Sequence, residues 1–318
     1  MLDISVIVPA FNEDESIPEL ASWIEKVMRE NNFSYEVLFI DDGSTDNTWE
    51  VIEQIHSKNN DIKGIKFQRN YGKSAALNTG FQAAKGEVVI TMDADLQDSP
   101  DEIPELYKMI KSDGYDLVSG WKKKRYDPIS KTIPSKFFNF VTSIMSGIRL
   151  HDFNCGLKAY NYKLVKSIEV YGEMHRYIPV IAKRSGFKKI TEKVVIHRER
   201  KYGVSKFGLE RFIFGFLDLM SITFVSRFKK KPMHFFGSLG TIFSFFAIAS
   251  FLKLSWNIIY SKWIIQEKIQ RELTDQPLFF VTLTLLIIGI QLFLAGFVGE
   301  MVSLNDPNRN DYLIEKKL

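Results

Sequence analysis

Two aspartates and a glutamine follow an apolar run that has the length of a buried strand. The run extends from Glu87 to Met92, and Asp93, Asp95 and Gln97 come soon after it. Carboxylate and amide oxygens suit a hard cation such as Mg²⁺ or Mn²⁺, which commonly bridges substrate phosphates. Such a cation neutralises the charge that develops on a diphosphate leaving group. The cluster predicts a metal site at Asp93, Asp95 and Gln97, although turns also use aspartate freely.

The elements that must position this cluster alternate between strands and helices. Apolar runs of strand length occupy Ile4–Val8, Val37–Ile40, Gly64–Phe67 and Glu87–Met92. Helix-like stretches include Ser16–Glu30 and Thr48–Ser57. Because the apolar runs are too continuous for a sheet with one wet face, this rhythm predicts a buried parallel sheet that is covered by helices.

Polar residues follow three of these strands. Asn12, the segment Asp41–Asp46 and the segment Asp93–Gln97 all lie at predicted carboxyl ends. Ligands of parallel sheets gather at that edge, so we expect these residues to form one site.

Three segments near these strand ends carry a family resemblance. They are Val6–Glu13 after the first strand, Asp41–Thr48 after the second, and Asn70–Gly80 at the start of a helix. With the aspartate cluster, they resemble the family 2 inverting glycosyltransferases of the GT-A fold, over roughly the first 100 residues. The resemblance implies an α/β domain with a Rossmann-like mixed sheet that is flanked by helices.

The resemblance also implies how a nucleotide-sugar donor is bound. The residues implied to contact the donor nucleotide are Pro9, Phe11, Glu13, Asp41 and Asp93. The ring of Phe11 offers a face for stacking, and carboxylates accept hydrogen bonds from ring N–H groups and ribose hydroxyls. In the alternative interpretation, Asp42, Ser44 and Asp46 form a turn that caps a helix at Thr48.

Three later segments resemble the polyprenyl-phosphate branch of this family, which includes dolichol-phosphate mannose synthases and bacterial undecaprenyl-phosphate glucosyltransferases. The segments are His151–Tyr160, Glu173–Pro179 and His197–Lys206. The resemblance implies that Asp152 faces the acceptor and that Asp152 and Asp95 are the catalytic residues. The residues implied to hold the acceptor phosphate are Lys122, Lys131, Ser135, Arg198, Arg200 and Lys206.

Cationic side chains beside an amphipathic surface suit a lipid phosphate headgroup. The alternative is a solvated basic face that anionic lipids attract. We interpret His151, His175 and His197 as structural, because no metal-ligand spacing joins them. Cys155 precedes a glycine and is interpreted as a small packed residue.

Two long segments without Asp, Glu, Lys or Arg lie in the last third of the chain. They are Met233–Leu252 and Pro277–Gly299. At about 1.5 Å per residue, each helix would span the roughly 30 Å of a bilayer core. They predict a transmembrane hairpin, and the basic cluster Arg227–Lys231 before it favours a cytosolic start. We therefore predict a multi-pass protein of the inner (plasma) membrane with a cytosolic catalytic domain.

Two further stretches mix Phe, Ile and Met with basic residues, as a helix in the lipid headgroup layer does. They are Lys131–Arg149 and Ser205–Phe228, and ordinary amphipathic helices on the sheet are the alternative. We expect a glycosyltransferase domain at 1–204, with an interface helix at 131–150. An amphipathic juxtamembrane helix at 205–231, the hairpin at 232–300 and a cytosolic tail at 301–318 would follow.

Composition restricts the partners and the compartment. The net charge of +4 among 318 residues suits a bilayer surface or phosphorylated substrates, and it does not favour nucleic acid. A single cysteine excludes an intramolecular disulfide and fits a reducing compartment. The N-terminal apolar run is short and lacks a basic segment, so it is interpreted as a strand and not as a signal peptide.

These patterns predict a metal-dependent, inverting transfer of one hexose, with UDP-glucose as donor and undecaprenyl phosphate as acceptor. GDP-mannose or a UDP-aminosugar is the alternative donor. Processive family members carry a Gln-x-x-Arg-Trp motif, and its absence here favours transfer of a single sugar. The rival of another class is a non-catalytic membrane scaffold or lipid-glycan carrier. A homo-oligomer is left open.

Overall fold

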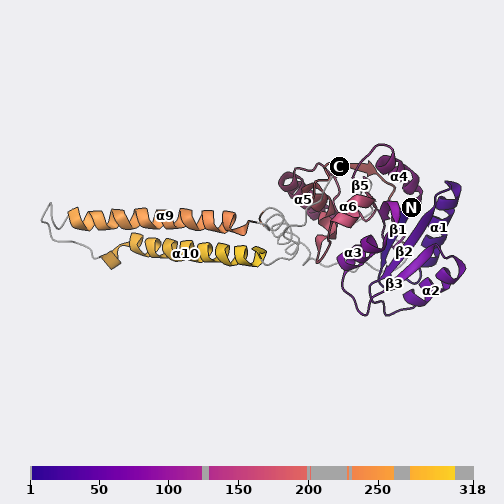
Figure 1. The fold of residues 1–318 in the computed structure, drawn as a ribbon, viewed down its shortest axis with the longest axis horizontal. Coiled ribbons are helices and arrows are strands. Elements are labelled where there is room, and N and C mark those ends of the chain that lie inside the picture. The colour runs from indigo at the N-terminus through magenta and orange to yellow at the C-terminus, as the bar shows by residue number, and fades with distance from the viewer. Residues whose placement is uncertain are drawn as a thin grey trace. The chain divides into compact units, whose positions relative to one another are not determined.

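The computed structural model describes residues 2–123, 129–198, 201, 228, 231–260 and 273–304 (Figure 1). Within these ranges, the side chains of 129–134 and 136–138 are not described. The chain divides into two compact units, Met1–Thr223 and Phe224–Leu318. The first unit contains the predicted sheet, and the second contains two long apolar helices.

Four parallel strands form the first half of the sheet. They are β1 (Leu2–Ala10), β2 (Tyr35–Asp41), β3 (Ile62–Lys66) and β4 (Gly86–Thr91). β1 lies between β2 and β4, and β3 pairs with the outer side of β2. All four strands were predicted from their apolar runs, and the structure extends each of them by one or two residues at its amino end.

The second half of the sheet changes direction. β6 (Lys158–Asn161) runs antiparallel to both β4 and β5 (Leu117–Trp121), and β7 (Ile190–Val194) runs parallel to β5. The order is β3-β2-β1-β4-β6-β5-β7 among the described residues. The mixed sheet implied by the family resemblance is confirmed, whereas the strand-and-helix rhythm alone predicted only parallel strands.

Helices cover both faces of the sheet. They are α1 (Ile17–Glu30), α2 (Thr48–Lys58), α3 (Lys73–Ala83), α4 (Ile103–Lys111), α5 (Ile129–Ser146), α6 (Tyr162–Ser167) and α7 (Ile178–Arg184). Alternate residues of β1 show why its sequence is apolar throughout. Val6 and Val8 belong to a core shared with α1 and α4, and Ile7 belongs to a second core shared with α3, α6 and α7.

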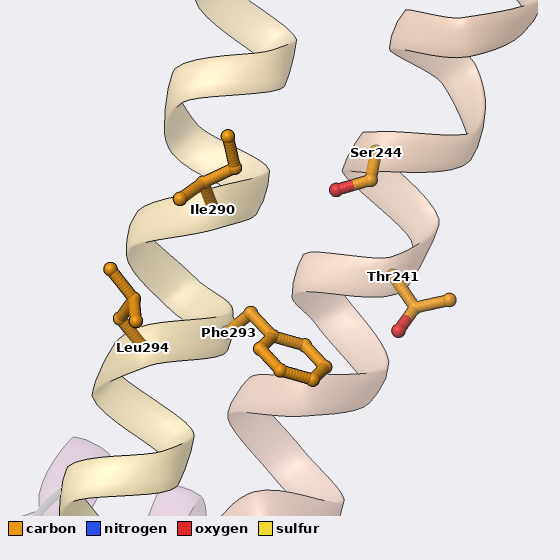
Figure 2. A pocket seen from close by; sticks show the side chains of 5 residues that line it. All are labelled: Thr241, Ser244, Ile290, Phe293 and Leu294. Carbon is orange, nitrogen blue, oxygen red and sulfur yellow. The ribbon is translucent and has the colours of Figure 1, made fainter.

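The second unit is a pair of packed helices, α9 (Pro232–Ile259) and α10 (Pro277–Leu304). Glycines allow their backbones to approach, since a Cβ built on Gly240 would lie 2.7 Å from the carbonyl oxygen of Gly289. Figure 2 shows a pocket between them that is lined by Thr241, Ser244, Ile290, Phe293 and Leu294. Both helices have the length and composition to cross a membrane. Most of their large apolar side chains face outward.

A buried carboxylate joins three strands of the first unit. Glu36 accepts hydrogen bonds from Ser5 Oγ at 2.7 Å, Lys63 Nζ at 2.7 Å and the Lys85 amide at 2.8 Å. Burial alone would raise the pKa of Glu36, but these three donors outweigh it and hold that pKa below its usual range. The ionised form of Glu36 therefore stabilises the amino-terminal edge of the sheet.

Glu36→Gln should lower the free energy of unfolding by about 1.5–3 kcal/mol at neutral pH, because hydrogen bonds to a charged group are lost. The folded pKa of Glu36 is depressed, so its contribution is present above the unfolded pKa and disappears as pH falls through the folded value. Urea unfolding of the full chain in detergent should show that the free energies of unfolding of wild type and variant become equal in acid. Glu169→Gln, at an exposed position, is the matched control. If wild type and Glu36→Gln differed by the same free energy of unfolding at every pH, the stabilising role of ionised Glu36 would be contradicted.

Candidate active site

The predicted residues meet at one edge of the sheet. Ala10, at the end of β1, is directly opposite Asp41 at the end of β2. On the other side of β1, Ile7 is opposite Thr91, the last residue of β4. The segments that follow these three strands therefore start side by side, as the sequence predicted.

The loop after β1 is tied to the loop after β2. The Asn12 amide donates to Ser44 Oγ at 2.9 Å, and Asn12 Oδ1 accepts from the Thr45 amide at 2.8 Å. The Glu13 amide donates to Thr48 Oγ1 at 2.8 Å. Asn12 adopts a φ of 54°, a left-handed conformation that asparagine tolerates. These bonds fix the segment that carries Phe11 and Glu13.

The two aspartates that end β2 have different surroundings. Asp41 Oδ1 accepts from the Ser44 amide at 2.9 Å, while its buried Oδ2 accepts no hydrogen bond from the part of the chain that the structure describes. Asp46 Oδ1 accepts from the Thr48 amide at 3.0 Å at the start of α2. The turn interpretation is thus confirmed for Asp46, and Asp41 retains one buried acceptor.

Asp42 positions the loop that leads into α3. Its carboxylate accepts from the Tyr71 amide at 2.7 Å and from the Gly72 amide at 2.9 Å. Burial raises the pKa of Asp42. Gly72 has a φ of 91°, which favours glycine, and it lets the chain turn into α3 with Lys73 first.

Lys73 forms an ion pair with Asp93, the first aspartate of the predicted metal cluster. Burial alone would raise the pKa of Asp93, but the ammonium groups of Lys73, Lys122 and Lys158 lower it well below its usual range. A Cβ at Gly156 would lie 2.5 Å from the Asp93 carboxylate, so a larger residue at that position would displace the carboxylate. Asp93 is therefore ionised, and sequence reasoning did not identify its partner.

A second ion pair lies directly behind the cluster. Lys122 Nζ is 2.9 Å from Oδ1 of Asp98, whose side chain is fully buried. Burial alone would lower the pKa of Lys122, but the Asp98 carboxylate raises it. Lys122 was predicted to bind the acceptor phosphate, and the structure places its ammonium against Asp98 instead.

Cys155 and Lys158 occupy the interior beside these charges. Lys158 donates to the Cys155 carbonyl, and burial lowers the pKa of Lys158. Burial raises the pKa of the Cys155 thiol to about 12, so the thiol stays protonated and unreactive. The prediction of a small packed cysteine is confirmed.

The rest of the predicted metal cluster is held by a tight turn. Asp95 Oδ1 accepts from the Gln97 amide at 3.2 Å, across Leu96 with a φ of 60°. Within the described ranges, no group of three or more His, Cys, Asp or Glu side chains could hold a metal. Two carboxylates and an amide fit Mg²⁺ or Mn²⁺, because such a cation takes further ligands from phosphates and water.

A distant segment is paired with this turn. The Arg198 amide donates to the Gln97 carbonyl at 2.9 Å, and Gln97 Nε2 donates to the Arg198 carbonyl at 3.3 Å. The Arg198 guanidinium itself lies 4.2 Å over the ring of Trp23. The structure therefore brings the backbone of Arg198 to the cluster and engages its side chain elsewhere.

Four further residues were predicted to bind the acceptor phosphate, and the structure describes the side chain of one of them, Ser135. Ser135 is half-buried on α5. Arg200 and Lys206 lie outside the described residues, as does the side chain of Lys131.

Asp152 is buried in the loop between α5 and β6. Its Oδ1 accepts from the Asn154 amide at 3.0 Å, and its carbonyl accepts from Ser119 Oγ at 3.2 Å. The preceding His151 ring stacks on Trp121 at 4.0 Å, and its Nδ1 pairs with Glu192. Four residues after Asp152, the same loop reaches Asp93 at Gly156, so the loop that carries the predicted acceptor aspartate lies against the predicted donor aspartate.

The Lys122–Asp98 pair gives a direct test of this buried arrangement. Lys122→Met should lower the free energy of unfolding by about 3–5 kcal/mol, because it leaves Asp98 buried without a counter-charge. The double variant Lys122→Met/Asp98→Leu should recover most of that loss. Urea unfolding in detergent measures the stability of both variants, and equal stability of wild type and the single variant would contradict a stabilising ion pair between Lys122 and Asp98.

Comparisons with known proteins agree with this geometry. The model of the family "Glycosyl transferase family 2" matches residues 5–169. A dodecaprenyl-phosphate galacturonate synthase of Rhizobium johnstonii is 34% identical over 305 residues, which cover 95% of this chain and 88% of that protein. An undecaprenyl-phosphate 4-deoxy-4-formamido-L-arabinose transferase of Aeromonas hydrophila is 31% identical and covers 94% and 88%.

Solved structures show the same fold at low identity. Mannosyl-3-phosphoglycerate synthase of Rubrobacter xylanophilus has a TM-score of 0.55 and 15% identity, covering 70% of this chain and 74% of that one. Glucosyl-3-phosphoglycerate synthase of Mycobacterium tuberculosis, in complex with Mn²⁺, UDP-glucose and phosphoglyceric acid, has a TM-score of 0.52 and 19% identity, covering 71% and 79%. The predicted GT-A fold is confirmed, and the chain belongs to glycosyl transferase family 2.

Proposed function

We propose that this glycosyltransferase moves a single sugar from a nucleotide diphosphate donor to a polyprenyl phosphate. The observation that carries the proposal is the loop that joins Asp152 to the glycine beside Asp93. This loop carries Asp152, which is proposed to face the acceptor, and its Gly156 lies beside a cluster that suits a diphosphate. The relatives that match nearly the whole chain are named for transfer to dodecaprenyl and undecaprenyl phosphate, which supports the same acceptor.

The donor nucleotide is proposed to bind between the loops after β1 and β2. Oδ2 of Asp41 is a buried acceptor that lacks a donor among the described residues, as recognition of a base N–H or a ribose hydroxyl requires. Phe11 and Pro9 provide apolar contacts at the same strand end. Glu13 Oε2 accepts from Ser16 Oγ at 3.1 Å, and the Glu13 carboxylate is proposed to contact the nucleotide.

The identity of the donor sugar is the finer part of the proposal. UDP-glucose is the first candidate, and GDP-mannose and UDP-aminosugars are the alternatives from the sequence. The names of the two relatives add a uronic acid and a formamido-arabinose to the candidates. The few side chains that contact a sugar decide between them, so a panel of donors is required.

The metal is proposed to be Mg²⁺ or Mn²⁺, held by Asp93, Asp95 and Gln97. When bound, it would neutralise negative charge on the diphosphate as the bond to the sugar breaks. Lys73 already pairs with Asp93, so its ammonium lies where it can also stabilise the departing diphosphate.

The reaction requires little proton transfer. A phosphate monoester has a second pKa of about 6, so the acceptor is largely a dianion at neutral pH and a competent nucleophile. Its oxygen forms a bond to the anomeric carbon as the bond from that carbon to the diphosphate breaks, and the electron pair leaves with the diphosphate. Asp152 is proposed to orient the acceptor in line with that bond. Side chains of the 198–206 segment are proposed to bind the phosphate, together with Ser135.

The membrane positions are also proposals. α9 and α10 are proposed to cross the inner membrane as a hairpin, with the catalytic domain in the cytosol. On α5, Phe140 and Ile144 are exposed by 63% and 66%, one helical turn apart, with Met145 beside them. This face is proposed to lie in the headgroup layer, where apolar side chains enter the acyl boundary.

The experiment that tests the function uses the purified full chain with undecaprenyl phosphate and a panel of radiolabelled sugar nucleotides. We expect one donor to label the lipid phase, with release of its nucleoside diphosphate. The non-catalytic scaffold or carrier instead predicts an unlabelled lipid phase with every donor, and that result would end the proposal.

Asp95→Ala should reduce transfer by at least about 100-fold, because an electrostatic contact to the diphosphate is lost. The unfolding transition in detergent should stay close to that of wild type. Asp113→Asn, an exposed carboxylate on the same domain, serves as the control for charge. Wild-type turnover in the presence of excess chelator would refute the metal role.

Asp152→Asn should reduce transfer by about 100-fold, by the same factor at every pH above about 7, because its proposed task is orientation and not proton removal. Rates relative to wild type across about pH 6 to pH 9 measure this. A loss that shrinks steadily as pH rises would instead assign proton removal to Asp152. Wild-type rates for both Asp152→Asn and Asp152→Ala would show that the acceptor site lies elsewhere.

Single cysteines in a Cys155→Ser background test the membrane positions. Labels at Asp275 and Ser303 should react from opposite sides of the membrane, because they flank one span. An environment-sensitive label at Phe140 should report an apolar medium only when vesicles are present, whereas a label at the exposed Asp113 should not change. Reaction of Asp275 and Ser303 from one side would exclude the hairpin.

A further inference from the structure

The described part of α5 has two faces of opposite character. Phe140 and Ile144 form an exposed apolar face. Asn139 and Thr142 form the opposite face, and both are buried, with Asn139 only 6% exposed. A buried asparagine at this point must find hydrogen-bond partners in the protein, since an unsatisfied amide costs about 1–3 kcal/mol.

Asn139 finds these partners on both sides of Asp152. Its Nδ2 donates to the His151 carbonyl at 2.9 Å, and its Oδ1 accepts from the Phe153 amide at 3.3 Å. One side chain therefore contacts the peptide groups that precede and follow Asp152. Two bonds at these positions restrict the backbone torsions that aim the Asp152 carboxylate.

Other contacts hold the loop together with Asn139. Phe153 is buried in a small core with Ile148, Tyr177 and Val180. Ser119 holds the Asp152 carbonyl, and it does so from β5. Ser143 and Ser146 also connect the loop to α5, both at Ile148, whereas Asn139 connects it to α5 on either side of Asp152.

We propose that Asn139 is a positioning residue for Asp152, through which the placement of α5 sets the acceptor end of the active site. The inference rests on the proposed function, because Asp152 is assigned to the acceptor there. It connects the apolar face of α5 to Asp152 through the two hydrogen bonds of Asn139. A helix whose outer face contacts lipid thereby holds, by its inner face, the residue that meets a lipid phosphate.

Asn139→Ala removes both bonds and lets the Asp152 carboxylate rotate. A misplacement of about 1 Å costs roughly 100-fold in rate, so kcat for transfer to undecaprenyl phosphate should fall between about 10-fold and 100-fold. The donor KM and the dissociation constant of the nucleoside diphosphate should stay within about twofold of wild type, because Asn139 contacts none of the donor loops.

Asn139→Asp distinguishes positioning from a merely structural role, because only positioning makes the transfer rate of this variant depend on pH. The variant keeps an acceptor for the Phe153 amide but replaces the donor to the His151 carbonyl with a second oxygen. Burial raises the pKa of a carboxyl group, and the protonated group can donate again. Its rate relative to wild type should therefore rise as pH falls from about 8 to about 6, whereas the relative rate of Asn139→Ala should stay low.

Asn161→Ala is the matched control. Asn161 Oδ1 accepts from the Leu164 amide at 2.8 Å, and its Nδ2 donates to Asp116 at 3.0 Å. Asn161 is opposite Val88, toward the other end of β4 from the candidate site. It should lose stability comparable to Asn139→Ala and retain the transfer rate.

The outcomes separate the inference from the proposed function. If wild type transfers no sugar to the lipid, the proposed function fails and the inference fails with it. If wild type transfers sugar and Asn139→Ala does so at the same rate, only the positioning role is overturned. It is also overturned if donor affinity falls in parallel with kcat, or if Asn161→Ala loses the same activity.

Discussion

The candidate site depends on the pairing of carboxylates with ammonium groups. Asp93 and Asp98 lie within one turn of chain, and each is paired with a lysine from another element, Lys73 and Lys122. Without Lys73, burial would raise the pKa of Asp93, because burial disfavours the charged carboxylate. The pairing keeps Asp93 ionised, and it connects α3 and the end of β5 to the loop after β4. The shape of the site therefore follows from its charge balance.

Much of the fold was predictable because its signals are local. The apolar runs of β1 to β4 and the long apolar segments of α9 and α10 read directly from the sequence, and the structure places them within a few residues. The reversal at β6 was not predictable from periodicity. Strand direction is decided by pairing partners far apart in the chain, and the four residues Lys158–Asn161 carry too little pattern to show it.

The residues of the candidate site were predictable from the sequence where their proposed function requires a particular residue type. Asp41 and Asp93 lie at the carboxyl ends of β2 and β4, as the sequence predicted, whereas the lysines that pair with Asp93 and Asp98 were not identified from the sequence. Lys122 is an example. The sequence favoured a phosphate ligand at this position, because it does not show that a buried aspartate, Asp98, lies 2.9 Å from the ammonium group. Asn139 gave no sequence signal at all, because an amide that bonds backbone groups depends only on how a helix docks.

The close contact of α9 and α10 through Gly240 and Gly289 bears on how such chains diverge. Where backbones touch, no larger side chain can be accommodated without separating the helices. On the outward faces, any apolar side chain of suitable size serves equally well. Substitutions in these two helices should therefore accumulate quickly on the outward faces and slowly where Gly240 and Gly289 meet. A pair of helices can in this way preserve its geometry over long evolutionary time while most of its residues change.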